Sequence, residues 1–298
     1  MYKQMKKIAW RLGSLLFALL LLVSCNSDDN FIDQGGNIQE EISLNVSYGE
    51  HEQQVYDLYL PEGRSAENTK VLVLIHGGGW IDGDKADMQE AVNLIRERHP
   101  DHAVANVNYV LANTNTPAFP NQFIDVVTII EQLTEQSDSL HINPTFGLIG
   151  ASAGAHIALM VDYNYDTEDQ VKFVGDIVGP TDFTDPFYSE DPNFEILLNL
   201  LVDESQYEEG IDLVEAISPA FQVSSNSSPT IMFYGNTDPL VPITNAYTIN
   251  NALDTAEIDN SLTIFDGGHG DDWSEAEIAS MYVKLSGYID TYLSVETP

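Results

Sequence analysis

Residues 146–156 read FGLIGASAGAH, and this stretch decides the fold class. The apolar residues 146–149 have the length of a buried β-strand, and a helix is predicted over residues 152–163. Small residues flank Ser152 on both sides and allow a sharp turn between the strand and the helix. Such a turn holds the Ser152 hydroxyl out at the carboxyl edge of a sheet, beside a helix N-terminus that favours developing negative charge. A bare Gly-x-Ser-x-Gly pattern also arises by chance, so other residues have to support Ser152 as a nucleophile.

A second glycine-rich segment, VLVLIHGGGW over residues 71–80, has the same plan. Residues 71–75 form a continuous apolar run, which is typical of a strand buried on both faces. Gly77–Gly79 follow this run, and without a Cβ their backbone N–H groups can approach a substrate oxygen closely. An acyl-transfer enzyme needs such donors for its oxyanion, together with the N–H of the residue after the nucleophile, here Ala153. The alternatives are a plain glycine turn and a phosphate-binding loop, and the second is disfavoured because no Gly-Lys-Ser/Thr follows.

The rest of the chain alternates predicted strands and helices. Residues 181–217 break this pattern, because they are acidic, contain prolines and are too long for a routine connection, so they are predicted to form a small lid insertion. The alternation predicts an α/β fold with a mostly parallel central sheet and helices on both faces, opened by an antiparallel strand pair. Strands are predicted over 42–48, 55–60, 71–75, 103–110, 146–149, 171–178, 231–234 and 262–265, and helices over 84–98, 121–136, 152–163, 245–253 and 275–293.

A serine nucleophile needs a base, and the base needs a carboxylate to orient it. Of the seven histidines, only His269 lies after residue 156, in a loop that follows a predicted strand. Asp238 follows the strand predicted over 231–234, which places it at the same sheet edge as Ser152 and His269. His156 is instead expected to pack or to hydrogen-bond, because it lies one turn along the helix from Ser152. The pattern predicts Ser152 as nucleophile, His269 as base and Asp238 as orienting acid.

The composition excludes several classes of function. The 298 residues hold 11 Lys and Arg against 47 Asp and Glu, which gives a formal net charge of −36. Nucleic acids and anionic lipid surfaces recruit basic residues, so neither is an expected partner. The single cysteine, Cys25, cannot form an internal disulfide, a cysteine-rich zinc site or an iron–sulfur cluster. No metal and no organic cofactor is expected, and no protein partner is predicted.

The N-terminal residues 1–24 are predicted to form a lipoprotein signal peptide. Basic residues come first, and the apolar run over residues 12–23 is shorter than the roughly 20 residues of a membrane span. Leu22-Val23-Ser24-Cys25 resembles the lipobox of bacterial lipoproteins, which implies cleavage before Cys25 and its lipidation; the alternative is an ordinary secretory signal. Residues 25–40 are predicted as an acidic flexible tether, and residues 41–298 as the folded domain. The acidic run over residues 27–29 resembles signals for the outer face of the outer membrane, so we expect an outer-membrane location.

Taken together, residues 76–80, residues 150–154, Asp238 and His269 resemble the α/β-hydrolase superfamily, in its branch of bacterial esterases with an HGGG motif. The resemblance covers roughly residues 55–293 and implies the α/β-hydrolase fold, with the triad residues in the roles given above. It also implies that the backbone N–H groups of Gly78, Gly79 and Ala153 form the oxyanion hole, with Gly77 as an alternative donor. Trp80 and residues 181–217 would then shape the substrate pocket.

The expected activity is that of a lipid-anchored serine carboxylesterase that works through an acyl-enzyme. The expected substrates are small-molecule or glycan esters, including acetyl or feruloyl esters of extracellular glycans. A small peptidase or an arylformamidase could use the same triad, and a surface binding protein could use the same scaffold without catalysis. A fluorophosphonate label on the serine would separate an enzyme from a binding protein.

Overall fold

The computed structural model describes residues 38–295. The predicted signal peptide, Cys25 and residues 25–37 of the predicted tether lie outside the described residues, so the predictions for them stay predictions. Among residues 38–295, no helix has both the length and the apolar character that crossing a bilayer requires.

The strands of the described chain form one eight-stranded sheet in the order β1-β2-β4-β3-β5-β6-β7-β8. β1 pairs antiparallel with β2, and β2 pairs antiparallel with β4. All the other pairings are parallel, so the predicted mostly parallel sheet with an antiparallel opening pair is confirmed. The strands are β1 Glu41–Ser47, β2 Val55–Leu60, β3 Val71–Ile75, β4 Ala103–Val107, β5 Phe146–Ala151, β6 Val171–Ile177, β7 Thr230–Gly235 and β8 Asn260–Phe265.

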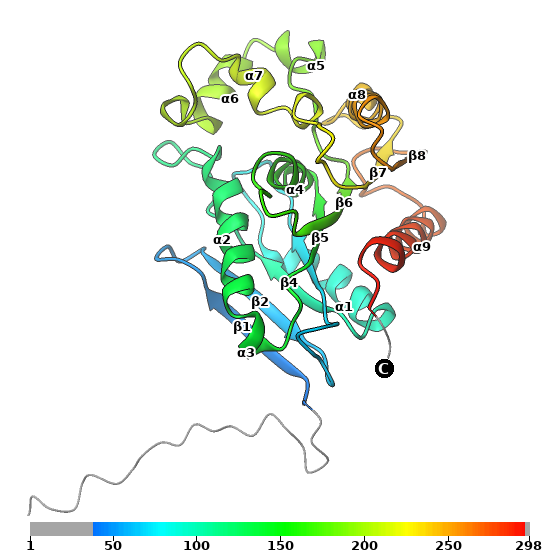
Figure 1. Ribbon diagram of the computed structural model, residues 1–298. Coiled ribbons are helices and arrows are strands. Elements are labelled where there is room, and N and C mark those ends of the chain that lie inside the picture. Colours follow the sequence, from blue (N-terminus) through cyan, green and yellow to red (C-terminus); the bar gives the residue numbers. More distant parts are fainter. Residues whose placement is uncertain (1–37, 296–298) are drawn as a thin grey trace, which may run out of the picture. The chain divides into compact units, whose positions relative to one another are not determined.

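Helices cover both faces of this sheet (Figure 1). In β3, Val71, Val73 and Ile75 face a core shared with α2 and α4, whereas Leu72 and Leu74 face a core shared with α1 and α9. This alternation follows from the two-residue period of a strand and explains why β3 is apolar throughout. The helices are α1 Gln89–Arg98, α2 Asn121–Glu135, α3 Ser137–Leu140, α4 Ala153–Asn164, α8 Ile243–Thr255 and α9 Glu275–Tyr292, and a 3-10 turn, η1 Lys85–Met88, precedes α1.

The sheet register brings the important loops to one edge. Ile75, the last residue of β3, is paired with Gly150 near the end of β5. Gly235, the last residue of β7, is paired with Phe265, the last residue of β8. The loops that carry the glycine run, Ser152, Asp238 and His269 therefore all begin at the carboxyl edge of the parallel strands. Ligand sites of open α/β sheets lie at this edge.

The connection between β6 and β7 is the longest in the described chain. It contains α5 Pro186–Ser189, α6 Phe194–Leu201, η2 Glu204–Gln206, α7 Leu213–Ala216 and η3 Pro219–Phe221, and Figure 1 shows α5, α6 and α7 gathered at one end of the domain. The backbone of Phe119, just before α2, exchanges hydrogen bonds with Leu201 and Asp203 and so ties the segment to the core. The lid role and the limits of residues 181–217 stay predictions.

Candidate active site

Ser152 lies on a strained turn between β5 and α4. Its φ is +52° and its ψ is −119°, values that a residue with a side chain rarely adopts. The turn is possible because its neighbours are small: a Cβ on Gly150 would lie 2.2 Å from the carbonyl oxygen of Gly154, and a Cβ on Gly154 would lie 2.2 Å from that of Ile75. The N–H of Ser152 donates to the carbonyl of Ile177 at 2.7 Å and holds the turn against β6.

The three residues of the predicted triad are in hydrogen-bond contact. Ser152 Oγ lies 2.8 Å from His269 Nε2, and His269 Nδ1 lies 2.6 Å from Asp238 Oδ2. An ionised carboxylate only accepts, so Nδ1 carries the proton toward Asp238 and Nε2 is free to accept the proton of the Ser152 hydroxyl. The sequence-predicted residues are thus brought together in the order and geometry that a nucleophile, a base and an orienting acid require.

The Asp238 carboxylate is held in its ionised form. Burial by itself would raise the pKa of Asp238, but hydrogen bonds from His269 and from the N–H groups of Val241 and Leu240 outweigh it and hold the pKa below its ordinary value. The two N–H groups donate to Oδ1 at 3.0 Å and 2.8 Å, which leaves Oδ2 for the histidine. The carboxylate is therefore both charged and aimed at His269.

The loop that carries His269 is clamped by two residues that the sequence analysis did not assign to the site. Asp272 Oδ1 accepts the N–H of Gly268 at 2.7 Å, and the Trp273 indole donates to the Gly268 carbonyl at 3.2 Å. Both backbone groups of the residue before His269 are thereby satisfied. Asp272 and Trp273 lie close to His269 in the sequence, so a role near the site could have been suspected. The sequence does not show which of the neighbouring carboxylates bonds to the loop.

The glycine run forms a tight turn that the carbonyl of Gly78 holds. The Gly78 carbonyl accepts from the N–H groups of Ile81 and Asp82 at 3.3 Å and 3.0 Å. Because the C=O and N–H of a trans peptide point in opposite directions, the N–H of Gly79 faces away from that turn. Gly78 and Gly79 have φ values of +113° and +58°, which only glycine adopts without strain.

The remaining oxyanion candidates adjoin the same position. A Cβ on Gly77 would lie 3.2 Å from the Cβ of Ser152, so the glycine run passes directly beside the nucleophile. Ala153 is the first residue of α4, and the first N–H groups of a helix have no partner within it. The structure thus places Gly77 and Ala153 beside Ser152. That the N–H groups of Gly78, Gly79 and Ala153 bind the oxyanion stays a prediction.

Trp80 is more deeply buried than the sequence analysis implied. Only 8% of its surface is exposed, and its indole N–H points at His156 Nδ1, 3.3 Å away. Its ring packs edge-on against Phe119 and tilted against Phe183. Trp80 therefore links the glycine run to the segment after β6, and its predicted contact with substrate stays a prediction.

His156 packs in the core, as the sequence analysis predicted, although its partner lies outside α4. Its Nε2 donates to the Ile217 carbonyl at 2.8 Å, and its Nδ1 accepts from Trp80. Complete burial lowers the pKa of His156 to about 4, so the ring is neutral at neutral pH. His156 is thus a structural link between α4, the glycine run and the end of α7. Within residues 38–295, no group of three or more His, Cys, Asp or Glu side chains is arranged to hold a metal ion.

Comparisons with known proteins find an esterase and a formamidase among the proteins that this chain is similar to. The family model described as BD-FAE matches residues 56–253. The chain is 24% identical over 213 residues to "Esterase LipC" of Mycobacterium tuberculosis, covering 67% of this chain and 52% of that protein. It is 33% identical over 136 residues to "Kynurenine formamidase" of Salmo salar, covering 43% and 42%. The chain thus spans about half the length of the curated relatives it matches, or less.

A solved structure confirms the fold. The "Truncated form of carbohydrate esterase from gut microbiota" superimposes with a TM-score of 0.66 at 19% sequence identity, and the match covers 83% of this chain and 96% of that one. The predicted α/β-hydrolase fold is confirmed by this likeness together with the eight-stranded sheet.

Proposed function

Since the chain belongs to the BD-FAE family, we propose that it is a serine carboxylesterase whose nucleophile is Ser152. The observation that carries the proposal is the unbroken hydrogen-bond chain from Ser152 Oγ through the His269 ring to the Asp238 carboxylate. This chain starts at the carboxyl edge of the sheet, where a substrate can reach the hydroxyl.

In the proposed reaction, Ser152 Oγ attacks the ester carbonyl while His269 Nε2 takes its proton. Asp238 stabilises the imidazolium that forms and keeps the ring in the correct tautomer. The carbonyl oxygen becomes an oxyanion, which the N–H groups of Gly78, Gly79 and Ala153 bind. His269 returns the proton to the departing alcohol, and a water activated by the same ring then hydrolyses the acyl-enzyme.

The proposed substrates are uncharged esters with an acetyl or an aromatic acyl group, including feruloyl esters of glycans. Apolar side chains near the triad support this class: Phe187 of α5 and Leu240 are 48% and 60% exposed. The Tyr188 hydroxyl donates to the Leu240 carbonyl at 3.3 Å, and the Leu240 N–H donates to Asp238, so α5 and this loop meet beside the triad. The likeness to a carbohydrate esterase also supports a glycan ester as substrate.

A second candidate is hydrolysis of an aryl formamide by the same residues. The observation that favours it is the 33% identity to "Kynurenine formamidase". Amide and ester hydrolysis share the nucleophile, the base and the oxyanion, and they differ in the leaving group that His269 must protonate. An N-formylaniline substrate beside the esters distinguishes the two.

We also propose that the protein is a lipoprotein, anchored through Cys25 in the outer membrane. The support is the sequence alone, from the basic N-terminus to Cys25. Metabolic labelling with a radioactive fatty acid should mark the wild-type protein and leave Cys25→Ala unlabelled. Label in both would contradict the anchor.

The test of the proposed activity is hydrolysis of p-nitrophenyl acetate, butyrate and octanoate, methyl ferulate and N-formylaniline by wild type and by Ser152→Ala. We expect turnover of at least one ester by the wild type, and a fall in kcat by a factor of about 10⁴ to 10⁶ in the variant with its circular dichroism unchanged. An exposed serine outside the predicted lid, Ser139→Ala in α3, is the matched control and should keep full activity. A folded wild-type protein that turns over none of these substrates would overturn the proposal.

A further inference from the structure

The loop after β4 contains a buried tyrosine that the reaction steps above do not use. Tyr109 is 1% exposed, and its ring stacks on the His76 imidazole with the ring centres 4.3 Å apart. Its hydroxyl lies 3.0 Å from the carbonyl oxygen of His76 and 3.2 Å from that of Gly77. Carbonyl oxygens only accept, so the hydroxyl donates its single proton to this pair. Burial raises the pKa of Tyr109 far above its ordinary value, and the hydroxyl therefore keeps that proton.

We propose that Tyr109 is a positioning residue for the oxyanion hole, acting through the carbonyl of Gly77. The inference rests on the proposed esterase function and assigns to this site a residue that does not touch the substrate. Only the Phe119–Pro120 peptide is cis within the described chain, so the Gly77–Gly78 peptide is trans. Its C=O and N–H then point in opposite directions. Holding the Gly77 oxygen toward Tyr109 thus turns the N–H of Gly78 the other way.

In this proposal, the Gly78 N–H turned away from Tyr109 is the one that binds the oxyanion. Gly77 passes beside the nucleophile, since a Cβ on it would lie 3.2 Å from the Cβ of Ser152. His76 Nδ1 donates to the same Gly77 oxygen at 2.6 Å, so the imidazole and the shared proton of Tyr109 both hold this oxygen. Glycine peptides have wide conformational freedom, and without these donors the Gly77–Gly78 plane could rotate and carry the Gly78 N–H away from the oxyanion. A preorganised donor contributes to catalysis because it need not reorient during the reaction.

The position of Tyr109 is itself fixed by hydrogen bonds of the two neighbouring residues. The residue before it, Asn108, accepts the N–H of Lys85 at 2.6 Å through its side-chain oxygen. The residue after it, Val110, donates its N–H to Asp125 Oδ2 at 2.8 Å. The backbone is therefore fixed on both sides of Tyr109, and the hydroxyl has a defined position relative to Gly77.

The test removes only the hydroxyl, in Tyr109→Phe. We expect kcat on the best ester to fall about 10- to 100-fold, less than the loss expected for a direct oxyanion donor, while KM changes by less than about threefold. Tyr56→Phe is the matched control: Tyr56 is also a fully buried tyrosine, and within residues 38–295 its hydroxyl has no hydrogen-bond partner. This control should keep the wild-type kcat.

A second measurement separates positioning from a general loss of structure. A boronic acid forms a tetrahedral adduct with the nucleophile and places an oxygen in the oxyanion hole, so its Ki should rise in Tyr109→Phe by about the factor by which kcat falls. If Tyr109→Phe does not fold, p-aminophenylalanine and p-methylphenylalanine at position 109 replace it. They have similar size, and only the first can donate, so it alone should retain activity.

The outcomes distinguish this inference from the proposed function. An inactive wild-type protein would overturn the esterase proposal and this inference with it. An active wild type with an unchanged kcat in Tyr109→Phe would overturn only the role of Tyr109. A rise in KM at constant kcat, or equal losses in Tyr109→Phe and Tyr56→Phe, would also contradict positioning.

Discussion

Ser152 and Gly78 both adopt backbone angles that most residues avoid. The turn at Ser152 places its hydroxyl within hydrogen-bond distance of His269, and the positive φ of Gly78 belongs to the turn that follows β3. Such strain persists only where the surroundings over-determine the conformation. Here the surroundings are β6, through the Ile177 carbonyl, and the close approach of Gly154 to Ile75.

Replacing Asp238 by Asn tests whether this carboxylate orients His269. An amide can donate to His269 Nδ1, which would place the proton on Nε2 and leave no acceptor for the Ser152 hydroxyl. We expect Asp238→Asn to lower kcat by about 10³- to 10⁴-fold with little change in KM. Steady-state kinetics on the same ester measure this. Asp266→Asn is the control, because Asp266 is exposed in the loop that carries His269 and contacts Asn236. Loss of activity in both variants alike would contradict the assignment.

Some residues of the candidate site could be predicted from the sequence, and others could not. Ser152, Asp238 and His269 were predictable because each follows a strand, and parallel strands bring their carboxyl ends to one edge. Tyr109 was not, since its contact with Gly77 joins residues that are 32 positions apart. The burial of Trp80 depends on Phe119 and Phe183, which approach it from two other loops. Nothing in the local pattern around these residues shows their partners.

Among the elements, α4 does more than present the nucleophile. His156, one turn after Ser152, accepts from Trp80 of the glycine run and donates to Ile217 at the end of α7. The contact with Trp80 needs the neutral ring, because a protonated Nδ1 would face the Trp80 N–H with a second proton. The β6–β7 segment and the glycine run are thereby joined to the same helix.

The burial of His156 predicts that the protein becomes less stable in acid. The pKa of His156 is about 4 in the folded protein because of burial, and an unfolded histidine titrates near 6.5. Between these values the unfolded state binds more protons, so the free energy of unfolding falls as pH drops from about 6.5 to about 4, by at most about 1.4 kcal/mol per pH unit for this group.

Urea unfolding across that pH range tests the prediction in His156→Gln. The glutamine amide does not titrate, so the variant should be less stable at pH 7 but lose less stability on acidification than the wild type. His76, His99 and His102 also have pKa values lowered by burial, and they contribute equally in both proteins. The exposed His51→Gln is the control and should follow the wild type. An identical pH dependence in His156→Gln and wild type would contradict the link.

Element bounds were predictable to within a few residues where the hydrophobic pattern has a sharp end. β2 has the predicted bounds, because Pro61 stops its alternation. β4 was predicted to reach residue 110 but ends at Val107, since Asn108 and Val110 turn out of the sheet to bond Lys85 and Asp125. The helix predicted from residue 152 begins at Ala153, because Ser152 has a positive φ.

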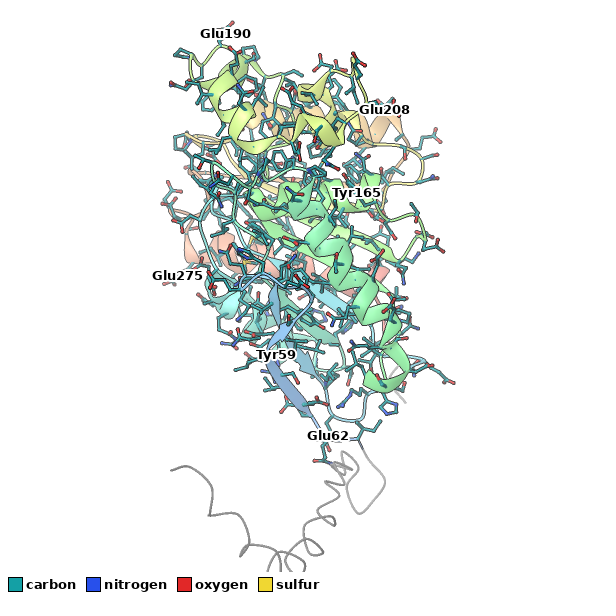
Figure 2. All side chains as sticks on the ribbon, turned by 90° about the vertical axis from the view of Figure 1, so that its left-hand side faces the viewer. Tyr59, Glu62, Tyr165, Glu190, Glu208 and Glu275 are labelled. Carbon is teal, nitrogen blue, oxygen red and sulfur yellow. The ribbon has the colours of Figure 1, made fainter. Side chains whose placement is uncertain are left out.

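The whole molecule has an uneven charge distribution. No Lys or Arg occurs between Lys172 and Lys284, a stretch that includes the β6–β7 segment and the loops of Asp238 and His269. The same stretch is rich in carboxylates, and Figure 2 shows Glu190 and Glu208 on the end of the domain opposite Glu62. The half of the domain that carries the triad acid and base therefore repels anions.

This asymmetry predicts a salt effect that depends on substrate charge. For a neutral ester, kcat/KM should be nearly constant between about 20 mM and about 500 mM NaCl. For an ester of the same size with a free carboxylate, such as p-nitrophenyl hemisuccinate, kcat/KM should be several-fold lower at low salt and rise as salt screens the repulsion. The matched comparison is p-nitrophenyl butyrate. An anionic ester that is preferred at low salt would contradict the uncharged substrate class.

The fold as a whole was predictable because strands and helices alternate so regularly, and the match to the BD-FAE family confirms it. The strand order was harder to foresee, since β3 lies between β4 and β5 and the chain must cross over to reach it. The charge distribution is visible in the sequence, but its position relative to the triad requires the fold.

The most direct test of the central claim, that Ser152 is the nucleophile, is covalent trapping followed by intact-mass and peptide mass spectrometry. A fluorophosphonate should add one adduct to the wild-type protein, on the peptide that contains Ser152, and none to Ser152→Ala or to heat-unfolded wild type. Absence of the adduct on folded wild-type protein, or its location on any other residue, would contradict the account.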